Sequence, residues 1–305
     1  MKDKRAILIT GASGFVGLNA CDFFLKNGWI VYGLVDKGDV PNGVKKVRVD
    51  LLDFKKLKIE INKIKPSVIL HLGAYVVLDR NYAVACMCID VNIKGTLNLI
   101  EAVKNLPLKK FIFFSTEEVY GENRTPYKET QIPMPPSPYA VSKLAAENLC
   151  LLYHNLYNVP AVIMRIATIF GYHQPEARFI PGMMIKATKH EPLLLNSGKN
   201  KRDYLFIDSL LEAIDSAIKT KEVDGEIFNI GHSKSISGKM LAKKVVELSG
   251  SSSKIILNSF PDREGESKEW AMDNQKAKRI LKWKANNSID EDIVKTINFY
   301  KNKLS

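Results

Sequence analysis

The stretch Thr10-Gly11-Ala12-Ser13-Gly14-Phe15-Val16-Gly17 joins an apolar run, Arg5 to Thr10, to a segment in which apolar residues recur at helical spacing. An apolar run bounded by glycine is typical of a buried parallel strand, and the spacing after Gly17 is typical of a helix. Glycines here allow a tight turn and a close approach of the backbone to a pyrophosphate at the helix N-terminus. The stretch therefore predicts a strand, turn and helix that bind a dinucleotide.

A second apolar run, Ile30 to Val35, ends in Asp36, nineteen positions beyond Gly17. An acidic residue near this distance accepts hydrogen bonds from the adenosine ribose and disfavours a 2′-phosphate. Asp36 therefore predicts NAD rather than NADP, although the neighbouring Lys37 weakens the exclusion. The alternative is an ordinary glycine turn followed by a surface aspartate.

Strand-like and helix-like segments continue to alternate along the chain. Further strands are expected at 44–49, 68–71 and 111–115, and helices at 53–64 and 81–104. This alternation predicts an α/β fold with a Rossmann-type doubly wound parallel sheet, which binds ligands at the carboxyl ends of its strands. Because the elements become shorter after about Gly171, we expect a dinucleotide-binding domain over 1–170 and a smaller α/β substrate domain mainly over 171–305.

The composition is that of a soluble globular protein, with 305 residues of which 46% are hydrophobic and 26% charged. The 45 Lys and Arg residues outnumber the 33 Asp and Glu residues, so the net charge is +12. Such a surplus suits an anionic ligand, a nucleic acid or an acidic membrane. The basic residues form no block of about five or six and no stripe interleaved with aromatic residues, so we expect a solvated lysine-rich surface and no nucleic-acid partner.

The cysteines and histidines predict neither disulfides nor a metal site. Cys21, Cys86, Cys88 and Cys150 lack C-x-x-C spacing, and the five histidines lack metal-ligand spacing. The N-terminal apolar run is too short for a signal peptide, and no apolar stretch approaches the roughly 18 residues of a membrane span. We therefore expect a cytoplasmic protein without a membrane partner.

Two patterns follow the strand expected at 111–115. Ser115-Thr116-Glu117-Glu118-Val119-Tyr120-Gly121 sets adjacent carboxylates beside a hydroxyl, and Ser137-Pro138-Tyr139-Ala140-Val141-Ser142-Lys143 begins a helix with Ser137 as its N-cap. Tyr139 and Lys143 then lie one turn apart on one face. An ammonium group and a helix N-terminus both stabilise a phenolate, so Tyr139 is a candidate base near neutral pH. By itself, a Tyr-x-x-x-Lys pair is usually structural.

The glycine pattern and Tyr139-x-x-x-Lys143 together resemble the extended short-chain dehydrogenase/reductases, the NAD-dependent sugar-nucleotide epimerase and dehydratase family. Further landmarks in family order are Asp50-Leu51, His71-Leu72-Gly73-Ala74, Asn92-Ile93-Lys94-Gly95-Thr96, Arg202-Asp203-Tyr204 and Arg263-Glu264-Gly265-Glu266. The resemblance implies a tightly held NAD, oxidation of a sugar hydroxyl, and a C-terminal half that holds the nucleoside diphosphate.

Carried over by position, the resemblance assigns catalysis to Thr116, Glu117, Glu118, Tyr139 and Lys143. It implies that the last two also contact NAD, together with Gly11, Ser13, Gly14, Phe15, Val16, Gly17, Asp36, Asp50, Leu51, Leu72, Gly73 and Ala74. It implies substrate contacts from Asn92, Thr168, Arg178, Arg202 and Arg263. The family usually has Asn in place of Thr168, and the alternative for Arg202 is a surface arginine on a loop.

The pair Glu117-Glu118 favours one reaction within the family. Its epimerases usually carry small residues there, whereas its 4,6-dehydratases carry Thr-Asp-Glu or Thr-Ser-Glu before Val-Tyr-Gly. Once carbon 4 of the sugar is a ketone, the proton on carbon 5 is acidic and Glu118 fits the base that removes it. Glu117, in place of Asp, would protonate the departing 6-hydroxyl.

The resemblance therefore implies an NAD-dependent nucleotide-sugar 4,6-dehydratase whose sugar and nucleobase are unassigned. A 4-epimerase is the first alternative, followed by a UDP-glucuronate-type decarboxylase and a 4-dehydrogenase, and an NAD-sensing regulator is the non-enzymatic one. The helix expected after Lys143 is apolar on more than one face, and in the resembled family it pairs with a symmetry mate, so we expect a homodimer.

Overall fold

The computed structural model describes residues 5–77, 79–262, 267–285 and 288–304. The chain forms two compact units. The first comprises Met1–Gly121, Gln131–Arg165 and Ile214–Phe228, and the second comprises Glu122–Thr130, Ile166–Ala213 and Asn229–Ser305. Each unit thus draws on segments that are distant in the sequence. The single boundary expected near residue 170 stays a prediction.

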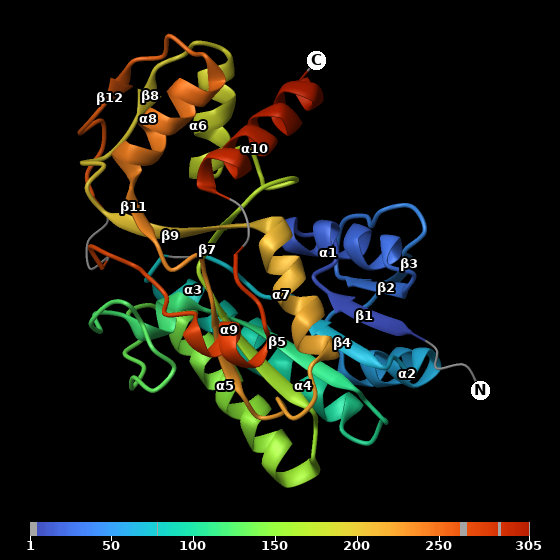
Figure 1. Cartoon of the computed structure of the whole chain (residues 1–305). Coiled ribbons are helices and arrows are strands. Elements are labelled where there is room, and N and C mark those ends of the chain that lie inside the picture. The colour runs from blue at the N-terminus through green and yellow to red at the C-terminus, as the bar shows by residue number, and fades with distance from the viewer. Residues whose placement is uncertain (1–4, 78, 263–266, 286–287, 305) are drawn as a thin grey trace. The chain divides into compact units, whose positions relative to one another are not determined.

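A seven-stranded sheet, as far as the described residues extend, has the order β10-β6-β5-β4-β1-β2-β3 (Figure 1). Its strands are β1 (Ala6–Thr10), β2 (Ile30–Val35), β3 (Lys45–Arg48), β4 (Val68–His71), β5 (Lys110–Thr116), β6 (Ala161–Ile166) and β10 (Ile227–Ile230). The neighbours from β5 through β4, β1 and β2 to β3 pair in parallel. The order reverses on either side of β1, which confirms the predicted doubly wound sheet.

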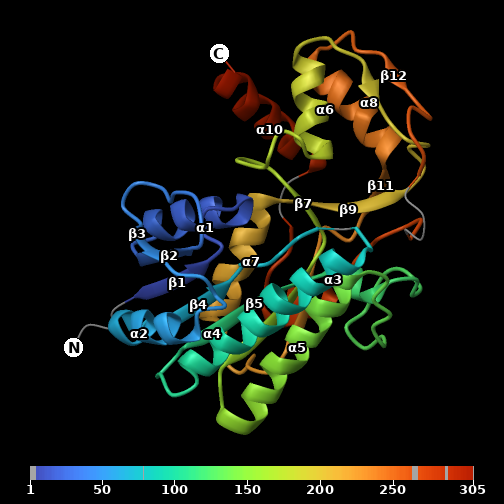
Figure 2. The same ribbon diagram turned by 180° about the vertical axis from the view of Figure 1, so that it is seen from behind.

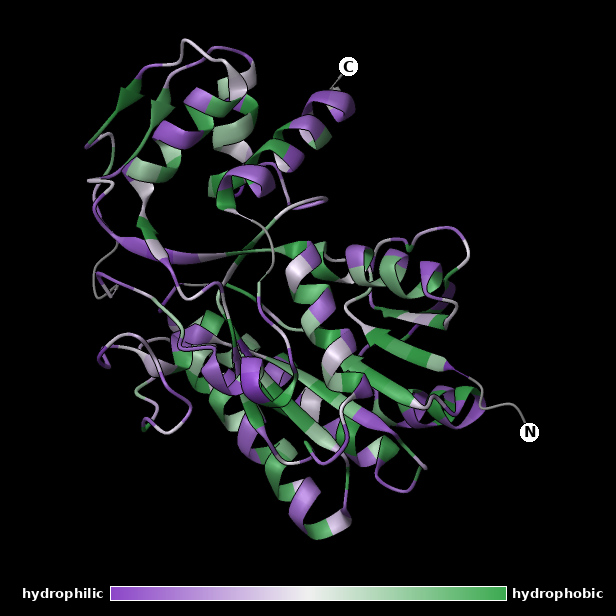
Figure 3. Cartoon of the chain, viewed as in Figure 1, coloured by the Kyte–Doolittle hydropathy of each residue, from purple (hydrophilic) through white to green (hydrophobic). Residues whose placement is uncertain are grey.

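Helices cover both faces of this sheet. On one face lie α2 (Phe54–Ile64), α4 (Gly95–Val103) and α5 (Pro138–Tyr157), whose side chains share a core with the strands, and α1 (Phe15–Lys26) packs against β1 and β2 from the other face (Figures 1 and 2). All five residues of β1 are buried. The central strands are hydrophobic almost throughout, whereas the edge strand β3 has one buried residue and the helices are mixed (Figure 3). A strand covered on both faces requires such a continuous apolar run.

Local sequence signals set the ends of the helix that carries Tyr139. Ser137 Oγ accepts a hydrogen bond from Ala140 N at 3.1 Å, and Pro138 occupies the first turn of α5. The helix ends at Asn158, whose left-handed backbone (φ 55°) lets its N–H reach His154 O. The N-cap expected from the sequence is therefore present.

The helix expected at 81–104 is a composite of α3 (Tyr82–Met87), a π-helix at Cys88–Lys94 and α4. Tyr82–Val103 as a whole has the length and composition of a membrane span. The prediction that no apolar stretch approaches the length of a membrane span was therefore wrong. This observation is weak evidence for a membrane, because core helices of soluble proteins share these properties. Leu99, Ile100 and Val103 are fully buried in the core of the first unit.

The second unit contains two small sheets in the described residues. One has the order β11 (Ser235–Ser237), β9 (Lys201–Phe206), β7 (Thr168–Phe170), and the other pairs β12 (Ile255–Ile256) with β8 (Leu193–Leu194). Its helices include α6 (Phe179–Thr188), α8 (Gly238–Ser249), α9 (Gln275–Ile280) and α10 (Ile289–Leu304), while α7 (Ile207–Lys219) runs through both units.

Candidate active site

The glycine turn between β1 and α1 forms a cradle that larger side chains would fill. Gly11 has φ +66°, and a Cβ there would lie 2.9 Å from Gly73 Cα. A Cβ on Gly17 would lie 2.1 Å from Gly11 O. Gly14 is the N-cap of α1 and offers no side chain to cap the helix, so the backbone N–H groups of the first turn, at Phe15 and Val16, begin an uncapped N-terminus. These features fit the pyrophosphate of a dinucleotide.

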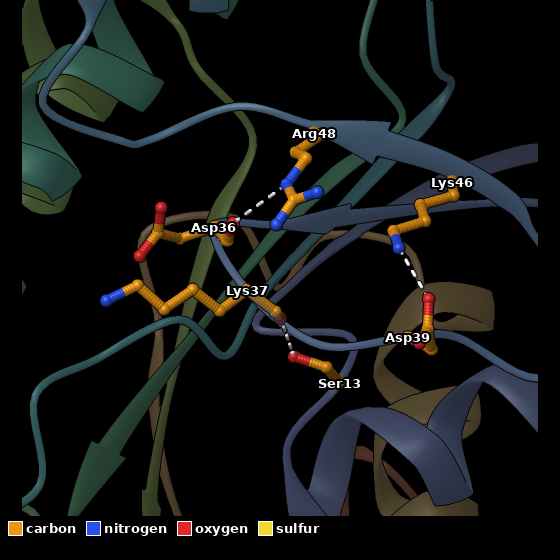
Figure 4. Close-up of polar contacts among 6 residues, drawn as sticks. All are labelled: Ser13, Asp36, Lys37, Asp39, Lys46 and Arg48. Carbon is orange, nitrogen blue, oxygen red and sulfur yellow. Dashed lines mark hydrogen bonds and ion pairs between the residues drawn. The ribbon is translucent and has the colours of Figure 1, made fainter.

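The end of β2 forms the neighbouring part of this edge (Figure 4). Asp36 is exposed, and its backbone carbonyl accepts a hydrogen bond from Arg48 Nε at 3.4 Å. Ser13 Oγ donates to Lys37 O at 2.8 Å and so ties the glycine turn to β2. The carboxylate of Asp36 fits the ribose acceptor expected from the sequence, with Lys37 and Arg48 as cationic neighbours.

The loops after β3 and β4 reach the same edge. Leu51 packs against two glycines, because a Cβ on Gly73 or on Gly95 would lie 3.2 Å from its side chain. Asp50 is exposed and its carboxylate accepts from Leu52 N at 2.9 Å. The residues Leu72, Gly73 and Ala74 follow β4 and are partly exposed. The structure therefore brings all of the expected cofactor-binding loops together at the carboxyl ends of the parallel strands.

Thr116 and Tyr139 meet beside this edge. Thr116 ends β5, Tyr139 lies in the first turn of α5, and their side chains are hydrogen-bonded. Burial, and then the charge of Glu118, raise the pKa of the Tyr139 phenol, while the bond from Thr116 opposes this. In the protein alone, the phenol is therefore a weaker acid than the sequence led us to expect.

Lys143 lies one turn further along α5 and is 3% exposed. Its ammonium group is 4.2 Å from the centroid of the Phe113 ring, a cation–π arrangement. Burial lowers the pKa of Lys143 to about 8, although the charges of Cys150 and Glu147 raise it in part. The side chain can thus change its charge within the range in which enzymes work.

The two adjacent glutamates have different environments in the 3-10 helix Glu117–Tyr120. Glu118 is partly exposed, and its Oε1 accepts a hydrogen bond from Ser137 Oγ at 2.5 Å. Because Ser137 is the N-cap of α5 and Tyr139 lies in its first turn, this bond holds Glu118 at the helix end that carries Tyr139, and the charge of Glu118 raises the pKa of the phenol. Glu117 is only 4% exposed. Glu118 is therefore the carboxylate that is open to a ligand beside Tyr139.

Sequence reasoning missed two residues of this group. Ser137 was expected only as an N-cap, yet it also holds Glu118. Cys88, expected only as a core cysteine, hydrogen-bonds to Ser142, which lies three residues after Tyr139 on α5. No local spacing signals either contact, because each joins segments that only the fold brings together.

Asn92 is enclosed within the first unit, with 2% of its surface exposed. Its Oδ1 accepts from Tyr75 N at 2.7 Å, and its Nδ2 donates to Tyr75 O at 3.1 Å and to Ser142 Oγ at 2.8 Å. These bonds occupy the amide that we expected to contact substrate. The placement gives Asn92 a role inside the protein.

The remaining substrate residues belong to the second unit. Thr168 begins β7 and is partly exposed, and Arg178 is the exposed N-cap of α6. Arg202, on β9, lies with its guanidinium 4.5 Å from the centroid of the Trp270 ring. Arg263 lies outside the described residues. Among the described residues, no group of three or more His, Cys, Asp or Glu side chains could hold a metal ion.

Comparison with known proteins agrees with this geometry. Residues 7–231 match the NAD dependent epimerase/dehydratase family. A dTDP-D-glucose 4,6-dehydratase from Dictyostelium discoideum is 30% identical over 80% of this chain and 62% of its own length. A UDP-glucuronate 4-epimerase from Thermodesulfobacterium geofontis is 30% identical over 97% of this chain and 96% of its own.

Solved structures give the same result for the fold. The UDP-glucuronic acid 4-epimerase from Bacillus cereus, in complex with UDP-glucuronic acid and NAD, is 28% identical with a TM-score of 0.88 and covers 98% of this chain and 99% of its own. The UDP-glucose 4-epimerase from Thermotoga maritima, with UDP-glucose, is 27% identical with a TM-score of 0.89 and covers 98% of this chain and 100% of its own. The chain therefore belongs to the NAD-dependent epimerase/dehydratase family and is an enzyme that uses NAD.

Proposed function

We propose that the protein is an NAD-dependent nucleotide-sugar 4,6-dehydratase. The observation that carries this proposal is the position of Glu118, a partly exposed carboxylate that Ser137 holds beside the phenol of Tyr139. Carbon 5 of a bound sugar is the neighbour of carbon 4, whose hydroxyl Tyr139 would deprotonate, so a base beside Tyr139 suits carbon 5. Such a base can act on carbon 5 after carbon 4 has been oxidised.

The reaction divides between three side chains of this site. Tyr139 accepts the proton of the 4-hydroxyl, and Glu118 then removes the proton from carbon 5, which the new ketone has acidified. Glu117 donates a proton to the departing 6-hydroxyl, so that water leaves and a carbon–carbon double bond forms. Gly11, Gly14, Gly17 and Asp36 would hold NAD, which would supply the hydride acceptor for carbon 4 and the hydride donor for carbon 6, while carbon 5 regains a proton.

The raised pKa of Tyr139 requires positive charge close to the phenol. Lys143, on the next turn of α5, supplies an ammonium group when it is protonated. The oxidised nicotinamide ring also carries a positive charge. Thr116 hydrogen-bonds to the same phenol and helps to stabilise its ionised form. Together these groups favour the phenolate when cofactor is present.

A 4-epimerase is the second candidate, because the Thermodesulfobacterium geofontis relative named for that activity matches over nearly the full length of both chains. An epimerase needs Tyr139 and NAD but no base at carbon 5. The dehydratase needs the carboxyl of Glu117 to reach the 6-hydroxyl, so its small exposure of 4% is the observation that favours the epimerase. The accessible position of Glu118 favours the dehydratase.

We also propose that the second unit holds a nucleoside-diphosphate sugar. Thr168, Arg178 and Arg202 are the described residues assigned to it, and Arg263 would complete the set. The two arginines suit a diphosphate, since a guanidinium pairs with phosphate oxygens through charge-assisted hydrogen bonds.

A homodimer in the cytoplasm is the assembly that we propose. Exposed apolar side chains lie on the Tyr82–Val103 helix and on α5, namely Tyr82, Met87, Ile89, Leu97, Val141, Leu152, Leu156 and Tyr157. These helices run side by side in both views (Figures 1 and 2). Exposed apolar side chains on two adjacent helices favour contact with a second copy. Light scattering at micromolar concentration should give the dimer mass, and a monomer would contradict it.

Mass spectrometry of the products from a panel of nucleotide sugars tests the function. We expect loss of one water from dTDP-glucose, UDP-glucose or a related nucleotide hexose. An isomer of unchanged mass would indicate a 4-epimerase, loss of carbon dioxide a decarboxylase, and loss of two hydrogens a 4-dehydrogenase. No reaction with any of them would favour an NAD-sensing regulator.

A further inference from the structure

A buried chain of hydrogen bonds begins at the dinucleotide turn in the first unit. Gly73 N donates to Thr10 Oγ1 at 2.9 Å, and Thr10 Oγ1 lies 2.7 Å from Nδ1 of His71. On the other side of the ring, Nε2 of His71 lies 2.9 Å from Thr96 Oγ1. Thr10, His71 and Thr96 are each at most 1% exposed. The chain thus crosses the edge of the sheet from β1 through β4 to α4.

The same chain continues to the helix that carries Tyr139. Thr96 Oγ1 donates to Asn92 O at 2.6 Å, and the Asn92 amide donates to Ser142 Oγ at 2.8 Å. Ser142 Oγ in turn donates to the backbone carbonyl of Tyr139 at 2.7 Å. Asn92 and Ser142 are 2% and 1% exposed. Every link lies within the first unit.

The number of protons on each side chain determines which group donates in each of these hydrogen bonds. A hydroxyl has one proton, so Thr96, which donates to Asn92 O, must accept at its oxygen from Nε2–H of His71. The ring of His71 is buried and neutral, and its single proton is used by Nε2, so Nδ1 accepts from Thr10 Oγ1, which in turn accepts from Gly73 N. Burial, and then the charge of Lys143, lower the pKa of His71 to about 3, in agreement with a neutral ring.

We propose that His71, Thr96, Asn92 and Ser142 are positioning residues that fix Tyr139 relative to the dinucleotide turn. The proposal rests on the proposed role of Tyr139 as the base at the 4-hydroxyl. Asn92 is central, because its side chain joins the π-helix to α5 and its carbonyl receives Thr96. A π-helical turn displaces the backbone from α-helical register, and such turns are frequent at functional sites.

Threonine 96 offers a matched pair of variants. Thr96→Val keeps the shape of the side chain and removes the hydroxyl, whereas Thr96→Ser keeps the hydroxyl. Ser142→Ala cuts the last link, and Ser67→Ala is its control, because Ser67 Oγ also donates to a backbone carbonyl in this unit, Ala6 O at 2.9 Å. The measurement is the rate at which bound NAD is reduced in a single turnover, per cofactor bound, with dTDP-glucose, UDP-glucose and UDP-glucuronic acid.

We expect Thr96→Val and Ser142→Ala to slow this reduction by about tenfold, with the substrate concentration for half-maximal rate unchanged, because misplacing a reacting group slows a step without weakening binding. Thr96→Ser and Ser67→Ala should stay near the wild-type rate. A purely structural role would lower the folded fraction and the bound NAD, but not the rate per bound cofactor. Normal rates in both Thr96→Val and Ser142→Ala would overturn the proposal.

A double variant separates this proposal from the proposed function. If Ser142 acts through Tyr139, adding Ser142→Ala to Tyr139→Phe should slow NAD reduction no further. Full activity of Tyr139→Phe, or no NAD reduction by the wild type with any of the three sugars, would refute the function and this proposal together. Independently, nitrogen-15 NMR should show His71 as the neutral Nε2–H form, identified by its loss in His71→Gln, and an imidazolium or an Nδ1–H form would contradict the chain.

Discussion

Glu117 and Glu118 are neighbours in the sequence, yet only Glu118 is both accessible and held beside Tyr139. Glu118→Gln removes the base and keeps the shape of the side chain. We expect reduced NAD to accumulate while release of the dehydrated product falls by about 100-fold or more, the usual contribution of a general base. Absorbance of the reduced nicotinamide and mass analysis of the product measure the two steps. Glu122→Gln, an exposed glutamate nearby, is the control, and normal turnover of Glu118→Gln would place the base elsewhere.

Ser137 combines two tasks that substitutions can separate. Replacing an N-cap serine by Ala costs about 1 kcal/mol, whereas Gly costs only a few tenths. Both variants remove the hydroxyl that holds Glu118. We therefore expect Ser137→Ala and Ser137→Gly to differ in melting temperature and to lose turnover by the same factor. Turnover that follows the melting temperature instead would show that the cap alone matters.

Among the residues of the site, the sequence predicted those that follow a local spacing or a family motif and no others. Thr116, Tyr139 and Lys143 follow from a strand end and a four-residue helical spacing, and the structure places them together. The contact between Ser137 and Glu118 spans 19 positions, and the bond from Asn92 to Ser142 spans 50. Such contacts have no period in the sequence, because they depend on how elements pack.

At the scale of elements, the carboxyl end of β2 sets cofactor choice. Asp36→Ala removes the carboxylate expected to bind the adenosine ribose and leaves Lys37 and Arg48 in place (Figure 4). We expect the preference for NAD over NADP, measured by calorimetric titration of both, to fall by about tenfold or more, since a 2′-phosphate then meets cations alone. Asp39→Ala is a matched control, because Asp39 is an exposed aspartate on the same loop that pairs with Lys46. An unchanged preference would show that another group reads the ribose.

The sequence predicted which helices and strands exist better than it predicted where one type of helix gives way to another. Apolar runs predicted β1, β2 and β4, because strands covered on both faces are apolar along almost their whole length. The π-helix at Cys88–Lys94 was missed, since the apolar residues around it keep roughly helical spacing. The extra residue of a π-turn depends on hydrogen bonds to other elements, such as those from Asn92 to Tyr75 and Ser142. The spacing of apolar residues does not indicate such bonds.

At the scale of the whole molecule, segments distant in sequence are held together by a buried carboxyl group in the second unit. Asp203 is fully buried, and its carboxylate accepts from His232 N, Ser233 N and Met272 N at 2.7, 2.8 and 3.2 Å. Burial raises the pKa of Asp203 to about 6 despite these bonds. The three bonds join positions that are 29, 30 and 69 residues apart in the sequence, and no local spacing signals them.

The sign of the resulting pH dependence follows from the raised pKa. The folded protein binds this proton more tightly than the unfolded chain, so the contribution to stability is full below about pH 4 and is lost as the pH rises through 6. Asp203→Asn lacks this titration. We expect the unfolding free energy of the wild type, from urea titrations, to fall by about 2 to 3 kcal/mol more than that of the variant between these limits. Parallel pH profiles would contradict the assignment.

The most direct test of the proposed chemistry is to run the reaction in deuterated water with the nucleotide sugar that the protein converts. Elimination requires that Glu118 remove the proton from carbon 5 and that a solvent proton later replace it. The product should therefore lack one water and carry one deuterium at carbon 5, as seen by mass spectrometry and NMR. A product of unchanged mass that differs only in the configuration of carbon 4 and carries no deuterium would contradict the account.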